Sequence, residues 1–302
     1  MKKKFIQILE WLGIMAVLTV IALLGWTIGG GNQTTVSLKW LQFVQTVATF
    51  LLPPVICAWM WDAGRKPFQW LRLDRGAKGR VFVWAVAVMV CAIPGINLLA
   101  DLNSRVELPE SLDFIEQILK RQEEAAAALT ERFLAADNIG GLILNIGLMA
   151  LLPAMAEEWS FRGTLQQILG RNHLAIWVTA FVFSAIHMQF YGFIPRMLMG
   201  TLFGYVFVWT GSLWVPVTMH FTNNCMAVLA YYFTDEIGEN GIKYADTIGA
   251  GNTWWLGVLS LLAVGALLWI FTSRDPLRCV RRTRTPESSC GYGYPTDAEQ
   301  ES

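Results

Sequence analysis

Three short clusters of ionisable and amide residues lie in stretches of the chain that are otherwise apolar. They occupy Glu157–Arg162, Phe183–His187 and His220–Asn224, and they contain two of the three histidines of the chain. Charged groups at membrane depth are costly, so they are treated as functional hypotheses by default. A carboxylate beside an imidazole can hold and deprotonate a water molecule. The residue types therefore predict hydrolytic chemistry.

Helical spacing assigns different roles to the two adjacent glutamates. Glu158 and Arg162 are four residues apart, so on a helix they can pair along one face. Glu157 is rotated from them by about 100° and is free to face another element. For Glu158 and Arg162 this favours a structural ion pair over direct participation in catalysis.

The third cluster supplies possible hydrogen-bond donors. His220 and Asn224 are also four residues apart, which places an imidazole and a carboxamide on one helical stripe. Such groups can donate to the oxyanion that forms at a peptide carbonyl. Asn223 is adjacent, and either asparagine could instead form a bond between helices. In the second cluster, Phe183 lies one turn before His187 and can form a wall of the site.

Chain length indicates which of these groups can meet. Glu157 lies fifteen residues before a turn expected at Arg171–Asn172, and His187 lies fifteen residues after it. An antiparallel hairpin would bring both to one depth, about 22 Å from the turn. His220 lies about eight residues beyond the next turn, so helix tilt or a deep loop must bring it to the depth of Glu157 and His187.

Two prolines precede site residues by four positions. They are Pro153, before Glu157, and Pro216, before His220. Because proline removes a helical hydrogen bond and bends the helix, we expect bends that open a wet cavity beside the two site residues.

The motifs Glu-Glu-x-x-x-Arg, Phe-x-x-x-His and His-x-x-x-Asn, in this order on successive membrane helices, resemble the CPBP family. That family comprises CAAX-type prenyl endopeptidases and bacterial bacteriocin-processing or immunity relatives. The resemblance covers residues 142–233, under a third of the chain, and all three motifs match.

The resemblance implies an intramembrane endopeptidase acting on a membrane-associated or lipid-anchored protein or peptide. It implies that Glu157 and His187 activate the water and that His220 with Asn224 stabilises the oxyanion. The residues expected to shape the site are Glu158, Arg162 and Phe183.

The metal requirement has two readings. Two histidines and a glutamate are the ligand set of many catalytic zinc sites, and members of the resembled family are often called metalloproteases. However, the chain has no His-Glu-x-x-His motif, and a carboxylate-activated water requires no metal. We expect no cofactor, with zinc or another divalent metal as the alternative.

Other functions compete with the endopeptidase. Ser160 and Ser184 lack an evident base, which argues against a serine mechanism. The chain could be a non-catalytic membrane protein that confers immunity or acts as a scaffold. It could also be a proton-coupled transporter, because Glu and His within spans form proton relays, although no repeated pair of interrupted helices is evident.

Composition predicts the elements that must position these groups. Hydrophobic residues make up 54% of the 302-residue chain and charged residues only 15%, against about 25% charge in soluble domains. In lipid the backbone must bond within each helix, so the predicted fold is an all-α, polytopic membrane bundle. About eight spans are expected, at 11–28, 40–61, 81–100, 138–156, 174–190, 197–234 (two helices divided at Thr210–Ser212) and 254–273.

Basic residues gather before the first span, after the second and after the last. The positive-inside rule then places both termini in the cytoplasm, and the layout suggests a bacterial inner membrane. The expected partners are membrane lipid and a protein or peptide substrate that could be lipidated, with no nucleic acid.

The chain divides into five expected regions. Residues 110–132 predict an amphipathic helix, and the composition from residue 283 onward predicts disorder. The regions are three N-terminal spans (1–100), an amphipathic extramembrane segment (101–137), the catalytic helical core (138–233), a loop and last span (234–273) and a basic, then disordered tail (274–302).

Overall fold

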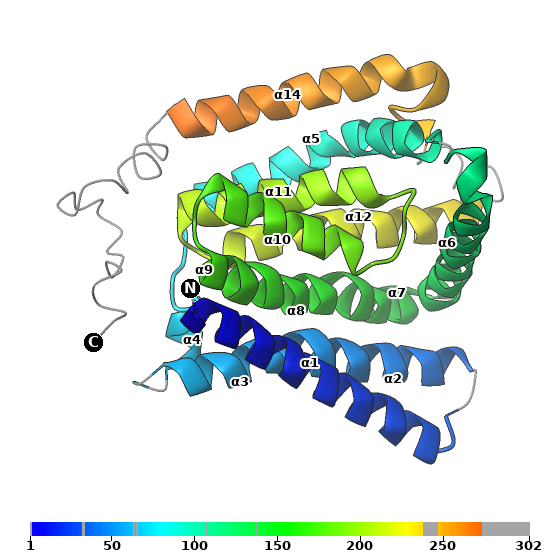
Figure 1. The fold of residues 1–302 in the computed structure, drawn as a ribbon. Coiled ribbons are helices and arrows are strands. Elements are labelled where there is room, and N and C mark those ends of the chain that lie inside the picture. The colour runs from blue at the N-terminus through cyan, green and yellow to red at the C-terminus, as the bar shows by residue number, and fades with distance from the viewer. Residues whose placement is uncertain are drawn as a thin grey trace.

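The computed structural model describes residues 2–31, 34–62, 64, 66–106, 108–136, 138–237 and 247–273. Throughout these ranges the regular structure is helical, with no strand. The tail predicted to be basic and disordered lies outside the described residues. Figure 1 shows the long helices running side by side, which confirms the predicted all-α membrane bundle.

The first half of the chain contains α1 (Lys2–Ile28), α2 (Thr35–Thr46), η1 (Val47–Leu51), α3 (Leu52–Trp61), α4 (Pro67–Trp70), α5 (Gly79–Ser104), η2 (Glu110–Leu112) and α6 (Asp113–Leu134). The second half contains α7 (Ile139–Asn145), η3 (Ile146–Leu151), α8 (Leu152–Ser160), η4 (Phe161–Gln166), α9 (Gln167–Leu169), α10 (His173–Ala185), α11 (Phe193–Thr210), α12 (Trp214–Ile237), η5 (Gly251–Thr253) and α14 (Trp254–Ser273). Of the short elements, η1, η3 and η4 are π-helical, while η2 and η5 are 3₁₀ turns.

Six helical segments of the described chain are long and apolar enough to cross a membrane: Lys2–Ile28, Thr35–Trp61, Gly79–Ser104, Ile139–Leu169, Phe193–Thr210 and Gly251–Ser273. The apolar helix α10 is shorter, with 13 residues. Helix α12 is long enough, but the polar run around His220–Asn224 lowers its hydropathy. The predicted number of eight spans is therefore not established, although α10 and α12 run beside the other helices (Figure 1).

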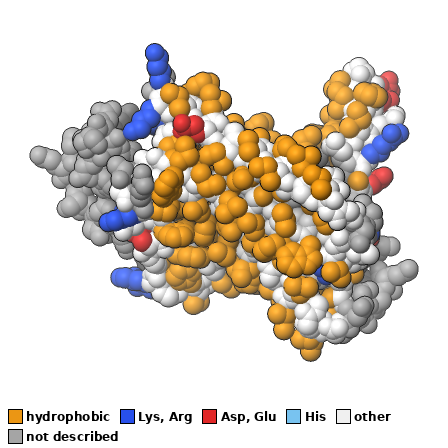
Figure 2. All heavy atoms as spheres, turned by 90° about the horizontal axis from the view of Figure 1, so that it is seen from below, with side chains coloured by type: hydrophobic (Ala, Val, Ile, Leu, Met, Phe, Trp, Pro, Cys, Tyr) orange, Lys and Arg blue, Asp and Glu red, His pale blue; other side chains and the backbone are white. Residues whose placement is uncertain are grey.

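The surface fits a lipid environment. Figure 2 shows one face of the bundle covered by hydrophobic side chains, with Lys and Arg gathered toward its ends. On α1, large apolar side chains such as Val17, Val20 and Ile21 are more than half exposed, at 58%, 53% and 59%. In water such a face would be a liability, whereas in lipid it is the stable arrangement. The protein is an integral membrane protein.

The helices that carry the three polar clusters lie in the middle of the bundle. In Figure 1, α8, α10, α11 and α12 are flanked on one side by α1–α3 and on the other by α5 and α14. Val88 and Met89 of α5 pack against Phe203 and Val206 of α11 and Met219 of α12 in one buried core. The flanking helices thus cover the central group on two sides, while α10 keeps an exposed apolar face with Leu174 and Phe181 at 73% and 55%.

The two site prolines act differently. Pro153 is the second residue of α8, just beyond the π-helix η3 (Ile146–Leu151), whose wider turns accommodate the ring and the missing N–H. Pro216 instead lies in the first turn of α12, where its N–H would have no helical partner in any case. The predicted bend at Pro216 is therefore wrong, and His220 stands on a regular helix.

The amphipathic helix predicted over residues 110–132 is present as η2 and α6. A buried polar group fixes its C-terminal end. The Asn145 amide donates to the Leu134 carbonyl at 2.7 Å, and the Lys39 ammonium donates to the Asn145 side-chain oxygen at 2.7 Å. Helices α2, α6 and α7 are thereby joined at one end of the bundle. Outside the membrane segments, a hydrogen bond from Lys120 lowers the pKa of Glu116.

Candidate active site

A helical hairpin brings Glu157 and His187 together. Gly170 turns the chain at a φ of 126° after α9, and the Asn172 side chain accepts from the Ala175 N–H at 2.8 Å to start α10. Glu157 Oε2 then lies 3.9 Å from His187 Nε2. The equal chain lengths on either side of the turn produce this match. His187 itself stands two residues beyond the end of α10, rather than within a helix as the predicted span 174–190 requires.

His220 reaches the same depth because the turn before it is recessed into the bundle. Gly211 ends α11 in the left-handed region, and Ser212 and Leu213 are fully buried. The Ser212 hydroxyl donates to the Arg75 carbonyl, and the Trp214 indole donates to the Leu73 carbonyl at 2.9 Å. The loop that follows α4 therefore covers this turn and satisfies its polar groups.

The recess of this turn makes up for the shorter length of chain between the turn and His220. A Cβ on Gly163 would lie 3.1 Å from Leu213, so the turn is level with Gly163 rather than with the hairpin turn at Gly170. Glu157 lies six residues from Gly163, and His220 lies seven residues from Leu213. Of the two ways to bring His220 level, the structure uses the deep loop.

Both imidazoles present the same nitrogen to Glu157. His220 Nε2 lies 3.8 Å from Glu157 Oε2, close to the 3.9 Å of His187 Nε2. His187 Nδ1 is 2.7 Å from the Phe183 carbonyl, which can only accept, so Nδ1 carries the hydrogen. The two Nε2–Oε2 separations exceed the length of a direct hydrogen bond.

A buried ion pair positions the His220 ring. Arg162 Nη1 donates to Glu158 Oε1 at 2.8 Å, and both side chains have no exposed surface. The same oxygen accepts from His220 Nδ1 at 2.9 Å. The predicted Glu158–Arg162 pair is present, and it also fixes which His220 nitrogen faces Glu157.

Aromatic rings enclose the buried pair and the imidazoles. The Arg162 guanidinium carbon lies 4.7 Å from the centroid of Phe183 and 5.4 Å from that of Phe203. Phe183 also meets the His187 ring edge-on at 5.0 Å, while Phe203 stacks on His220 at 5.4 Å. These rings keep the site away from lipid and favour a cation between them.

Two glycines on α11 complete the site and were not anticipated. Arg162 Nη2 donates to the Gly200 carbonyl at 2.9 Å, and the Gln166 amide donates to the Gly204 carbonyl at 3.1 Å. A Cβ on Gly204 would lie 2.8 Å from Gln166 Oε1, and one on Gly200 would lie 3.2 Å from Arg162 Nη2. The spacing Gly-x-x-x-Gly, which allows helices to approach closely, was the available signal.

Asn103 is a second unanticipated support. This buried residue near the end of α5 donates from Nδ2 to the Phe190 carbonyl at 2.9 Å and accepts from the Ile194 N–H at 3.0 Å. Irregular backbone within a membrane protein requires such partners. Asn103 therefore holds the turn that carries His187. In the sequence, only the position of Asn103 at the end of an apolar run indicated a structural role, and that indication is weak.

Asn224, Ser160 and Ser184 form their hydrogen bonds outside the Glu157 cluster. Asn224 stands one turn beyond His220, and among the described residues its side-chain oxygen accepts from Asn223 at 3.3 Å rather than from another site residue. The hydroxyl groups of Ser160 and Ser184 are buried and donate to backbone carbonyls at 2.8 and 2.7 Å. Neither serine faces an imidazole.

In the part of the chain that the structure describes, no group of three or more His, Cys, Asp and Glu side chains is placed to hold a metal ion. Glu157, His187 and His220 face one another, with Nε2 of both histidines directed at Glu157 Oε2.

Comparison with known proteins identifies the segment that contains the site. Residues 139–226, from the start of α7 into α12, match the family described as "Type II CAAX prenyl endopeptidase Rce1-like". The chain is also 37% identical over 83 residues to the uncharacterized protein YpbD of Bacillus subtilis (strain 168), a match covering 26% of this chain and 41% of that protein. The chain thus spans about two fifths of that relative's length. No solved structure matches.

Proposed function

We propose that residues 139–226, which match the Rce1-like family, make this protein an intramembrane endopeptidase of the CPBP family. It would hydrolyse a peptide bond in a membrane-associated or lipid-anchored protein or peptide. The observation that carries the proposal is the approach of two Nε2 atoms, of His187 and His220, to the same oxygen of Glu157 at 3.9 and 3.8 Å. Such separations suit a group hydrogen-bonded between them, as a reacting water would be.

Glu157 and His187 would activate the water. Because His187 Nδ1 donates to the Phe183 carbonyl, its neutral ring offers an Nε2 lone pair to the water. The Glu157 carboxylate accepts a proton as the water oxygen attacks the peptide carbonyl carbon. The same proton can then pass to the leaving amine, which completes hydrolysis.

His220 would stabilise the oxyanion. Its Nδ1–H is directed to Glu158, so Nε2 can donate to an oxyanion only when the ring is an imidazolium. Asn224, one turn along α12, is the proposed second donor.

The proposal is tested by reconstituted cleavage of a peptide panel with Glu157→Gln and His187→Ala. Each is expected to reduce kcat by about 10²–10⁴-fold, the usual contribution of a general base. His173→Ala is the matched control, because His173 pairs with Tyr205 at 2.6 Å, away from the Glu157 cluster. Cleavage by folded Glu157→Gln at the wild-type rate would refute the mechanism.

A chelator arm tests the metal requirement in the same assay. The expected result is an unchanged rate in chelator, because the proposed water is activated by a carboxylate. A rate that falls in chelator and returns with zinc would replace this mechanism with a metal-dependent one. Should the purified protein cleave no peptide while its Glu157 and His187 variants retain the cellular phenotype, the immunity or scaffolding alternative would be preferred.

The orientation is also proposed from charge. The bundle end that carries Lys2, Lys3 and Lys4 would face the cytoplasm of a bacterial cell, because basic residues are retained on that side. Labelling of single cysteines placed at residue 3 and at residue 118 by a membrane-impermeant reagent tests this. Labelling of residue 3 in intact cells would contradict the orientation.

A further inference from the structure

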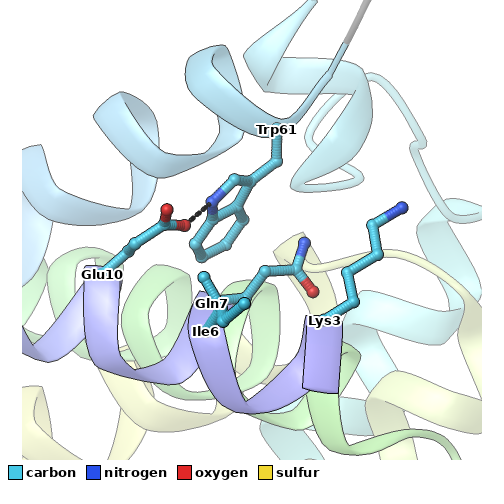
Figure 3. Close-up of a pocket in the computed structure, with 5 residues that line it drawn as sticks. All are labelled: Lys3, Ile6, Gln7, Glu10 and Trp61. Carbon is cyan, nitrogen blue, oxygen red and sulfur yellow. Dashed lines mark hydrogen bonds between the residues drawn. The ribbon is translucent and has the colours of Figure 1, made fainter. Parts of the chain in front are cut away.

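A groove away from the Glu157 cluster opens at the basic end of the bundle. Its volume is about 370 Å³, and its lining residues are Lys3, Ile6, Gln7, Glu10 and Trp61. The first four share one stripe of α1, at spacings of three, one and three residues, and Trp61 is the last residue of α3. Figure 3 shows the side chains from the two helices converging on one space.

The groove separates a cation from an anion. The Trp61 indole N–H donates to Glu10 Oε2 at 2.6 Å, which fixes the ring between the two helices. In Figure 3 the carboxylate of Glu10 lies on one side of the indole, and the side chains of Gln7 and Lys3 lie on the other. A bound molecule would therefore meet a carboxylate, an aromatic ring, an amide and an ammonium group.

The position of the groove indicates the kind of ligand available to it. It lies where α1 begins and α3 ends, at the end of the bundle that also carries Lys2, Lys4 and Lys66. Basic and tryptophan side chains at the ends of spans lie at the level of lipid headgroups. The apolar helix faces next to the groove are exposed, with Phe5 at 63% and Leu9 at 52%. Acyl chains can lie along these faces.

We propose that this groove binds the headgroup of a phospholipid that carries both a phosphate and a primary ammonium group, as phosphatidylethanolamine does. Lys3 and the Gln7 amide would donate to the phosphate. The ammonium would bind over the Trp61 ring and donate to Glu10, combining a cation–π contact with a charge-assisted hydrogen bond. Ile6 would contact the apolar part of the lipid below the headgroup.

Charge complementarity favours this headgroup over an anionic one. A phosphatidylglycerol headgroup also carries a phosphate for Lys3, but it offers no cation to Glu10. Its uncharged glycerol would meet the carboxylate instead, so the attraction between the ammonium and Glu10 would be lost. The groove is therefore expected to prefer the ammonium-bearing lipid, and Glu10 is the residue responsible for that preference.

The experiment measures retained lipid on the full-length protein. The protein is taken from nanodiscs that contain equal amounts of phosphatidylethanolamine and phosphatidylglycerol with the same acyl chains, and native mass spectrometry counts each lipid. Wild type is expected to retain the former in excess. Glu10→Gln should abolish that excess, because glutamine keeps an acceptor for the Trp61 indole while removing the charge.

Two lysine variants provide the matched comparison. Lys3→Gln should weaken retention of both lipids about tenfold, the effect of losing one charge-assisted hydrogen bond to the phosphate. Lys2→Gln removes the same charge one residue away, outside the groove, and should change neither lipid. Equal losses in the two lysine variants would mean that general basic charge, rather than the groove, retains lipid.

Other outcomes would overturn the proposal. They are equal retention of the two lipids by wild type, an ethanolamine preference that survives in Glu10→Gln, and a preference for phosphatidylglycerol. If Glu10→Gln unfolds, a photo-crosslinkable phosphatidylethanolamine is used on the wild type instead. Crosslinks are expected on the first three turns of α1 and at the end of α3, and their absence there would reject the site. Peptide cleavage is not part of either measurement, so the outcome is independent of the proposed endopeptidase.

Discussion

Replacing Arg162 with alanine removes the cation that faces a fully buried carboxylate. In the wild type, Glu158 Oε1 accepts from Arg162 at 2.8 Å and from His220 at 2.9 Å, and neither Glu158 nor Arg162 has exposed side-chain surface. The alanine variant leaves Glu158 with one hydrogen-bonding partner. It also removes the donor to the Gly200 carbonyl.

The expected loss of stability in Arg162→Ala follows from the complete burial of Glu158. Removing one partner of a buried ion pair lowers the free energy of unfolding by about 3–5 kcal/mol, because the other charge is left uncompensated. The double variant Glu158→Gln/Arg162→Met removes both charges and keeps an acceptor for His220. It should therefore be more stable than Arg162→Ala alone, despite carrying two substitutions.

Unfolding in mixed micelles with increasing denaturing detergent, followed by tryptophan fluorescence, measures these differences. Wild type, Arg162→Met, Glu158→Gln and the double variant form a double-mutant cycle, and Arg162→Ala is measured beside it. The reasoning would be refuted if Arg162→Ala lost less than about 1 kcal/mol, the range of exposed ion pairs. It would also fail if the double variant were less stable than Arg162→Ala.

Three further substitutions test the supporting contacts. Gly204→Ala should lower the unfolding midpoint, because its Cβ would lie 2.8 Å from Gln166 Oε1, whereas Gly265→Ala, with nothing within 4 Å, should not. Asn103→Ala leaves two backbone groups without a partner and should cost about 1–3 kcal/mol per group. Faster amide hydrogen exchange in the turn between α10 and α11 would report this loss of stability. An unchanged exchange rate would contradict the role of Asn103 in holding the turn. Lys39→Met removes the hydrogen bond to Asn145 and should release the C-terminal end of α6, measured as faster proteolysis of that helix in nanodiscs. Equal proteolysis of the two proteins would show that the Lys39–Asn145 bond does not anchor α6.

The helical membrane fold could be predicted from composition because lipid leaves the backbone few choices. Apolar runs without charge must form helices that satisfy their own hydrogen bonds. The divisions at Arg171–Asn172 and at Thr210–Ser212 were recognisable for the same reason, since they interrupt those runs with polar and glycine residues. The number of spans was less certain, because α12 carries polar site residues that lower its hydropathy.

Part of the site followed from simple counting along helices. The pairing of Glu158 with Arg162 is a local consequence of four-residue spacing, and the meeting of Glu157 with His187 follows from equal distances to one turn. Counting failed for His220, because the depth of a turn depends on what packs beneath it. There the buried Leu71 and Leu213, brought together from distant parts of the chain, set the level.

By itself, the sequence determined that this protein is a helical membrane bundle and that its polar clusters lie within apolar segments, because helix rise and residue spacing are local properties. Only the tertiary structure decided how His220 joins Glu157 and His187 and which contacts support all three. Three features depend on side chains from different helices. They are the recessed turn before His220, the approach of Arg162 and Gln166 to the glycines of α11, and the hydrogen bonds of Asn103 to the turn that carries His187. Such contacts follow from packing between helices, and no local pattern specifies them.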